Sequence, residues 1–318
     1  MSDTTNLRDP ILVAIWPGMG SVALIAGDYL LQQIRARRVT DLDMKEFFDV
    51  QSVEVFHGIA TVGHLPQNRV FEWNDPNEKH DLLIFMGEVQ PLAHGLALCK
   101  RVIDYAASRG VKEVFTFAAM ATQLKPGAIA QAFAVATDQP TLAKVCNLGA
   151  QPLESGQISG LNGVLLAAAA QSGLHGTCLL GELPYFAASA PNPGAAYAVL
   201  EKFTQLLGIK IDLGTLAHHA EAVNAQIKEF FQMLQHQAAL EKGLPEQDLD
   251  GSEPIPRDEL AAENRKPVDP VMKAKIEALF DKAKQDRTKA VELKHELDRL
   301  GLFKQYEDRF LDLFRNAA

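Results

Sequence analysis

Short apolar segments alternate with amphipathic segments along the first two thirds of the chain. Continuously apolar runs are typical of strands that are buried on both faces of a sheet. Segments of about ten to fifteen residues with apolar positions every three or four residues are typical of helices. The pattern predicts strands at 11–16, 50–56, 81–86, 111–117, 130–137 and 176–180, and helices at 22–34, 92–109, 141–148, 161–172 and 193–207.

This order of elements predicts the fold class. Strands that alternate with helices of this length form a parallel or mixed sheet with helices on both faces. We therefore expect residues 1–216 to form a three-layer α/β/α domain with a mixed, mostly parallel sheet.

The pattern changes to helical segments beyond residue 216. Apolar residues recur at helical spacing over 218–241, and a proline-rich stretch follows at 243–270. Two further amphipathic segments span 271–300 and 302–315. We expect residues 217–318 to form a helical extension that contains a linker.

Composition excludes several classes of protein. Of the 318 residues, 47% are hydrophobic and 22% charged, as in folded proteins. The formal net charge of −9 disfavours nucleic acid and anionic membranes as partners. No apolar run approaches the roughly 20 residues of a membrane span, and the first residues lack a signal peptide's apolar core. Three cysteines without a CxxC pair fit free thiols, so we expect a cytoplasmic protein.

A glycine-containing turn follows the first predicted strand. The segment from Gly18 through Gly20 and Ser21 to Ala23 fits the spacing of a dinucleotide-binding fingerprint. However, no acidic residue ends a convincing strand about twenty positions later. The turn therefore has three interpretations: a tight strand-to-helix connection, an anion site at backbone amides, or a dinucleotide site.

Polar residues also follow two other predicted strands. Glu88 and Gln90 come after the strand at 81–86, and Glu182 and Tyr185 come after the strand at 176–180. Ligands of open α/β sheets bind at the carboxyl ends of strands, so these residues are candidate ligand-binding residues. The alternative is a polar rim beside helix N-termini.

A serine and an asparagine complete the candidate site. Ser159 is one position late for the G-x-S-x-G nucleophile elbow, so a hydrolase loses its main support. Ser159 and Asn162 fit a loop and helix cap, with a ligand role as the alternative. The histidines and cysteines show no metal-ligand spacing, and we expect neither a metal nor a cofactor.

Several of these segments, in this order, resemble the PAC2 family of proteasome-assembly-chaperone-like proteins. They are 17–23 with 28–30, Gly87–Pro91, Ile158–Gly163, Cys178–Pro184 and Pro191–Gly208. The resemblance implies a fold similar to that of phosphorylases or hydrolases, and a homo-oligomer. The chain looks like bacterial members with a helical C-terminal extension, which mostly have no established activity.

The resemblance also implies a role in protein interaction. Eukaryotic relatives assist proteasome assembly, and archaeal relatives bind proteasome subunits, some through a C-terminal hydrophobic-tyrosine-any motif. This chain ends in Phe314–Ala318 without a penultimate tyrosine, so we do not expect that route of docking.

Two functional hypotheses follow from the sequence. The first is a non-catalytic, oligomeric protein-interaction or assembly-chaperone-like protein, a trimer or larger. The alternative is an enzyme or a binding protein for nucleoside- or phosphate-like molecules that uses the phosphorylase-like cleft. In that alternative the turn at Gly18, Gly20 and Ser21 binds an anion, and Glu88 or Glu182 binds hydroxyls or acts as acid and base.

Overall fold

The computed structural model describes residues 7–49 and 53–242, and also Ile276, Leu279, Phe280, Leu293 and Tyr306. By its contacts the chain divides into two compact units, Met1–Leu244 and Pro245–Ala318. In the second unit the five described residues are helical, and the rings of Phe280 and Tyr306 lie 5.9 Å apart. The predicted linker and most of the predicted helices at 271–300 and 302–315 lie outside the described residues.

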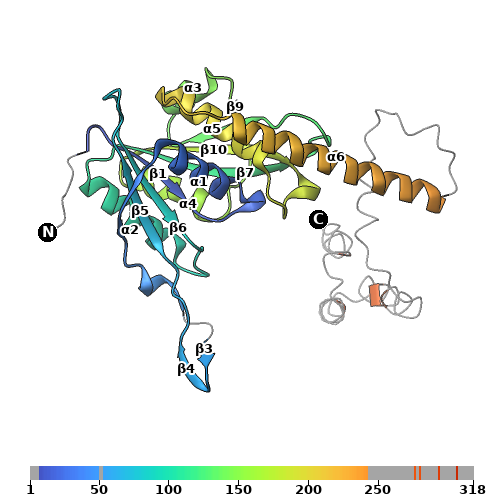
Figure 1. Ribbon diagram of the computed structural model, residues 1–318, viewed down its shortest axis with the longest axis horizontal. Helices are drawn as coiled ribbons and strands as arrows, with labels where there is room; N and C mark the ends of the chain where they lie inside the picture. Colours follow the sequence, from blue (N-terminus) through green and yellow to red (C-terminus); the bar gives the residue numbers. More distant parts are fainter. Residues whose placement is uncertain are drawn as a thin grey trace, which may run out of the picture. The chain divides into compact units, whose positions relative to one another are not determined.

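The first unit is built on a mixed eight-stranded sheet (Figure 1). In spatial order its strands are β2 (Arg37–Asp41), β5 (Asn68–Trp73), β6 (Leu82–Gly87), β1 (Ile11–Ile15), β7 (Glu113–Thr122), β10 (His175–Pro184), β8 (Ala132–Ala136) and β9 (Gln151–Pro152). The four central strands β6, β1, β7 and β10 are parallel. β5 is antiparallel to both its neighbours, and β8 is antiparallel to β10.

Helices cover both faces of this sheet. They are α1 (Val22–Ile34), α2 (Gly95–Ser108), α3 (Gln139–Cys146), α4 (Leu161–Gln171), α5 (Pro193–Leu207) and α6 (Gly214–Lys242). Alternate residues of β1 enter two separate cores: Val13 packs with α1 and α5, whereas Leu12 packs with α2 and α4. This alternation confirms the three-layer α/β fold that the sequence predicts.

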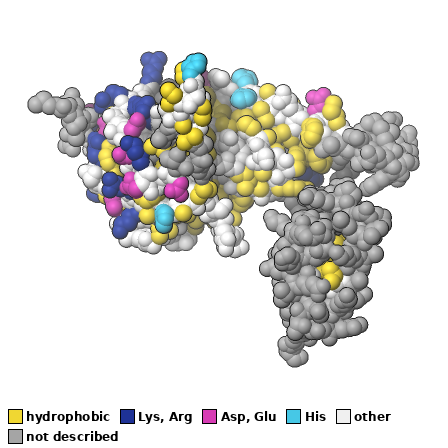
Figure 2. All heavy atoms as spheres, turned by 90° about the horizontal axis from the view of Figure 1, so that it is seen from below, with side chains coloured by type: hydrophobic (Ala, Val, Ile, Leu, Met, Phe, Trp, Pro, Cys, Tyr) yellow, Lys and Arg dark blue, Asp and Glu magenta, His cyan; other side chains and the backbone are white. Residues whose placement is uncertain are grey.

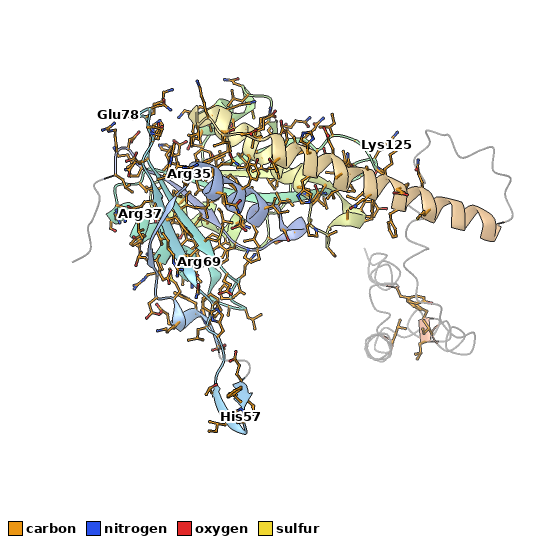
Figure 3. All side chains as sticks on the ribbon, viewed as in Figure 1. Arg35, Arg37, His57, Arg69, Glu78 and Lys125 are labelled. Carbon is orange, nitrogen blue, oxygen red and sulfur yellow. The ribbon has the colours of Figure 1, made fainter. Side chains whose placement is uncertain are left out.

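The structure adds four strands that the sequence did not predict, β2, β4 (Ile59–Val62), β5 and β9, and it places one predicted strand outside the main sheet. The prediction places a strand at 50–56, of which 50–52 lie outside the described residues. β3 (Val53–Phe56) pairs with β4 in a separate two-stranded sheet, and with no strand of the main sheet among the described residues. The hairpin turns at His57 and Gly58, whose φ angles are +50° and +79°. Positive φ at both central residues is the geometry of a tight type I′ turn. Figure 1 shows the hairpin projecting from the body of the unit, and Figure 3 marks His57 at its tip.

The long helix α6 lies entirely within the first unit. Its residue Leu216 is buried in the core beside α1 and α5. Farther along α6, the amide of Asn224 accepts a hydrogen bond from the backbone of Gly127 and donates one to the carbonyl of Ala128. None of the described helices is long and apolar enough to cross a lipid bilayer.

Candidate functional site

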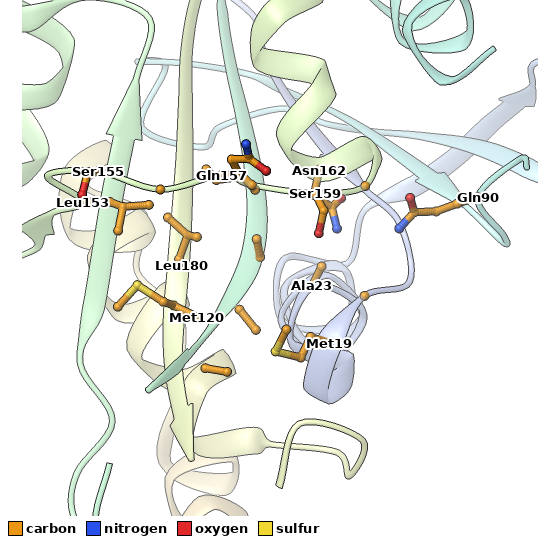
Figure 4. A pocket seen from close by; sticks show the side chains of 17 residues that line it. Met19, Ala23, Gln90, Met120, Leu153, Ser155, Gln157, Ser159, Asn162 and Leu180 are labelled. Carbon is orange, nitrogen blue, oxygen red and sulfur yellow. The ribbon is translucent and has the colours of Figure 1, made fainter. Parts of the chain in front are cut away.

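A pocket of about 500 Å³ opens where β1 ends and β7 continues (Figure 4). One wall comes from the turn that follows β1, with Gly18 and Met19, and from Ala23 of α1. The opposite wall comes from the loop at 153–160, which leads into α4. The pocket therefore occupies the carboxyl edge of the sheet, where ligands of open α/β sheets bind.

The turn after β1 uses its backbone amides within the fold. The amide of Gly20 donates to the carbonyl of Ala188 at 2.8 Å, and the amide of Ser21 donates to the carbonyl of Gly18 at 3.0 Å. Gly20 has φ +60°, and a Cβ there would lie 2.5 Å from Leu183 Cδ2. These contacts favour a tight strand-to-helix turn over an anion site, because the two amides already have acceptors.

Asn162 joins the start of α4 to the end of β1. Its side-chain oxygen accepts from the backbone amide of Trp16 at 3.1 Å and from Thr116 Oγ1 at 3.3 Å. Its amide nitrogen donates to the carbonyl of Trp16 at 3.1 Å. The buried side chain therefore imitates a neighbouring strand and supplies both hydrogen bonds that the backbone of Trp16 needs.

Gln90 makes a similar connection from the loop after β6. Its Nε2 donates to the carbonyl of Pro17 at 2.5 Å, and its Oε1 accepts from the backbone amide of Leu161 at 2.8 Å. The second bond satisfies one of the free amides at the N-terminus of α4. Together, Gln90 and Asn162 hold the turn after β1 against the start of α4, and this sets the width of the pocket.

Glu88 lies outside the pocket and makes contacts of its own. Its carboxylate accepts from the backbone amide of Gln67 at 2.8 Å and lies 3.0 Å from His64 Nε2. These two hydrogen bonds, the Gln67 bond first, hold the pKa of Glu88 below its ordinary value of 4.5. Glu88 is therefore ionised at neutral pH and carries no proton that it could donate as a general acid.

This low pKa predicts a pH-dependent effect of replacing Glu88 by glutamine. The ionised carboxylate stabilises the folded state above about pH 4.5, and that contribution is lost as pH falls through the lower folded-state pKa. We expect Glu88→Gln to lower the melting temperature at neutral pH, and the difference from the wild type to shrink in acid. Thermal melts of both proteins between neutral and acidic pH measure this difference in melting temperature. A difference that stayed constant with pH would contradict the prediction.

Glu182 and Tyr185 also lie outside the pocket, at the end of β10. The Glu182 carboxylate accepts from Thr122 Oγ1 at 2.7 Å and from the backbone amide of Gln131 at 3.3 Å, so it joins β10 to the end of β7 and to the residue before β8. Tyr185 begins a short 3-10 turn, η3 (Tyr185–Ala187), and is about half exposed. Its ring packs edge-on against Phe186, which stacks on Phe231 of α6.

The pocket thus contains four of the nine predicted site residues: Gly18, Gln90, Ser159 and Asn162. The other five, Gly20, Ser21, Glu88, Glu182 and Tyr185, are absent from its lining. Sequence reasoning missed the stretch Ala118–Ala121 of β7, which forms the back of the pocket. These residues carry no reactive side chain, so no motif signals them.

The chemistry of the lining is uncharged. Of the described residues around the pocket, none has an ionisable side chain; the polar ones are amides and hydroxyls such as Gln157 and Ser159. Among the described residues, no three histidine, cysteine or acidic side chains are placed to hold a metal ion. Cys99 and Cys178 are buried in the cores, and burial raises the pKa of each thiol to about 12.

The sequence is similar to one family of proteins and to a relative from an archaeon. The sequence profile of the PAC2 family matches residues 12–230. An uncharacterized protein of Methanocaldococcus jannaschii is 25% identical over 259 residues, 78% of this chain and 94% of that protein.

Solved structures share the fold. A PAC2 family protein of Streptomyces avermitilis is 24% identical, with a TM-score of 0.59 over 70% of this chain and 95% of that one. PbaB of Pyrococcus furiosus, an archaeal proteasome activator, is 23% identical, with a TM-score of 0.60 over 73% of this chain and 95% of PbaB. A proteasome-assembly chaperone homologue of Mycobacterium tuberculosis is 20% identical, with a TM-score of 0.58 over 69% of this chain and 94% of that homologue. Because the family profile spans most of the chain and solved members have the same fold, the chain belongs to the PAC2 family.

Proposed function

We propose that this chain is a non-catalytic, oligomeric protein-interaction protein with a chaperone-like role. Its structural relatives include an archaeal proteasome activator and homologues of proteasome-assembly chaperones, which supports an action on other proteins. The uncharged lining of the pocket offers no acid or base among the described residues, which favours binding over catalysis. Free cysteines fit a reducing compartment, so we propose a cytoplasmic location.

The observation that carries this proposal is the hairpin of β3 and β4. A two-stranded hairpin is marginally stable by itself in water, and this one pairs with no other strand of the described chain. It nevertheless exposes four large apolar side chains: Val53 (56%), Val55 (66%), Phe56 (74%) and Ile59 (68%). An exposed apolar cluster of this kind marks a surface that another protein covers.

A second copy of this chain is the partner that we propose for the hairpin. Figure 2 views the molecule from the side toward which the hairpin projects in Figure 1. On this face hydrophobic side chains gather over the middle, whereas charged side chains gather toward the left. Apolar surface of this kind, covered by identical subunits, is typical of stable homo-oligomers, and we propose a trimer or larger.

Removing the apolar side chains of the hairpin tests this proposal. We expect the double variant Val55→Ser, Phe56→Ser to dissociate into smaller species, because it removes two of the four exposed apolar side chains of the hairpin. Native mass spectrometry of the full chain measures the subunit number. Ile129→Ser is the matched control, because Ile129 is 86% exposed outside the hairpin and should leave the oligomer intact.

Two results would contradict the proposal. One is a monomeric wild type, and the other is a double variant that keeps the subunit number of the wild type. Because the replaced side chains are exposed, we expect the folded core to keep its thermal stability, which a melt of each variant checks.

We also propose that the segments beyond residue 216 extend the α/β domain of residues 1–216. The contacts of Asn224 with the loop at 127–128 attach the first turns of α6 to the loop between β7 and β8, which supports this part of the proposal. We propose that residues 217–318 act as this extension and enlarge the surface available to partners.

A further inference from the structure

The back of the pocket is an open edge of strand β7. Pairing between β7 and β1 ends at Ala14 and Thr116, whereas pairing between β7 and β10 continues to Thr122. Within residues 7–49 and 53–242, no strand pairs with β7 on the β1 side beyond Thr116. The main chain of 117–122 therefore presents an edge inside the sheet, where a neighbouring strand would normally lie.

Asn162 produces this open edge. Its amide occupies the place beside Trp16 where the next residues of a strand would pair, and it also accepts from Thr116. After Trp16 the chain turns away into Gly18 and α1. A slot then remains beside β7, and Ala118–Ala121 line it at about 3.3 Å per residue, or about 13 Å in all.

Unpaired main chain in a slot needs hydrogen-bond partners. Successive residues of a strand direct their N–H and C=O groups to opposite edges, so two of the four residues Ala118–Ala121 face the slot. Ala118, Ala119 and Met120 are partly buried and Ala121 is exposed, so water reaches these groups until a strand pairs with them. An extended peptide supplies donors and acceptors at this spacing, and strand addition to a free edge is a general mode of peptide recognition.

The side walls define which peptide fits. Ala23 of α1 lies on one side of the sheet layer, and Ile158 packs with Met120 and Leu180 on the other side. These four side chains are apolar, and the polar side chains of the lining, such as Gln157 and Ser159, are uncharged. Alternate side chains of an added strand would meet these two walls, so small, uncharged side chains are favoured.

We propose that the pocket binds an extended, uncharged peptide segment of a partner protein, which pairs with the free edge of β7 at Ala118–Ala121. This proposal rests on the protein-interaction function proposed above and gives that function a specific site. The site is separate from the hairpin: the hairpin joins copies of the chain, and the slot binds a partner segment.

Methyl groups in the slot allow a direct test. We would label alanine and methionine methyls of the full chain and titrate it with the peptide acetyl-Ser-Val-Ala-Val-Ala-Ser-amide. The expected result is a saturable shift of the methyl signals of Ala118, Ala119, Met120 and Ala121. Two versions of the peptide, methylated on one or the other alternate set of amide nitrogens, are the matched probes. We expect one version to lose the shift and the other to keep it, because an added strand donates from one set only.

Variants on either side of α4 locate the binding. Ser159→Trp places a large ring at the mouth of the slot. It should lower the affinity for the peptide by at least about tenfold, or about 1.4 kcal/mol. Ser172→Trp, at the exposed far end of the same helix, should leave binding unchanged. Methyl spectra without peptide show whether both variants are folded.

Several outcomes would overturn the proposal. Absence of any shift would do so, as would equal binding of both methylated versions, which would indicate a pocket for apolar groups or small molecules. If Ser172→Trp lowered the affinity for the peptide as much as Ser159→Trp does, the peptide would bind outside the slot. Each of these results leaves the subunit number unchanged, so failure of the peptide site is distinguishable from failure of the oligomer proposal.

Discussion

Replacing Asn162 by alanine is expected to lower the free energy of unfolding by about 2–6 kcal/mol. The variant leaves the amide and the carbonyl of Trp16 buried without their partners, and each such group costs about 1–3 kcal/mol. Asn162 is only 4% exposed, so its amide bonds with protein groups rather than with bulk water. Urea denaturation of the wild type and the variant measures the difference.

An exposed asparagine provides the control for this variant. Asn147 ends α3 at the surface, and we expect Asn147→Ala to change the free energy of unfolding by no more than about 0.5 kcal/mol. If Asn162→Ala behaved like this control, the joint between β1 and α4 would contribute little, and the account of the pocket's width would be wrong.

Replacing Gly181 by alanine is expected to destabilise the protein by about 3 kcal/mol, the upper end of the usual range for overpacked cores. Gly181 lies inside the sheet on β10, paired with Ala119 on one side and Ala132 on the other. A Cβ at this position would lie 2.2 Å from the carbonyl oxygen of Ala195 on α5. Relief of this clash requires backbone movement, so α5 must shift away from the sheet.

A neighbouring glycine makes a matched comparison. Gly194 lies in the first turn of α5, and a Cβ there would make only ordinary contacts, at 3.4 Å from Asn192 Oδ1. Because alanine is a better helix former than glycine, we expect Gly194→Ala to be neutral or slightly stabilising. Thermal and urea denaturation of both variants test the pair. Comparable stability of Gly181→Ala and the wild type would show that α5 tolerates the displacement.

Much of the fold could be predicted from the sequence because its central strands are continuously apolar. Ile11–Ile15 and Leu82–Met86 are buried along their whole length, and that pattern is visible in one sequence. β2 is largely exposed at the sheet edge, and four of its five residues are charged or polar, so it gives no hydrophobic signal. β5 does alternate between buried and partly buried residues, but charged Arg69 and Glu72 interrupt its apolar pattern.

The candidate site was less accessible to sequence reasoning. Residue types such as Gln90 and Asn162 suggested ligand binding, but the structure shows both amides bonded to backbone groups. A side chain that imitates a strand cannot be recognised from its neighbours in sequence, because its partner is far away along the chain. The unpaired edge of β7 is a property of the main chain. The side chains of Ala118–Ala121 have the apolar pattern of ordinary core positions, so the sequence does not reveal the edge.

The bonds between Asn162 and Trp16 also bear on how the chain folds. They join residues that are 146 positions apart, so the slot exists only after β1, β7 and α4 have all come together. Contacts of such long range are slow to form, and during synthesis α4 leaves the ribosome long after β1. A nascent or partly folded chain therefore has no slot beside β7. A segment that binds there, as we propose, would therefore engage only fully folded molecules, so binding would follow folding.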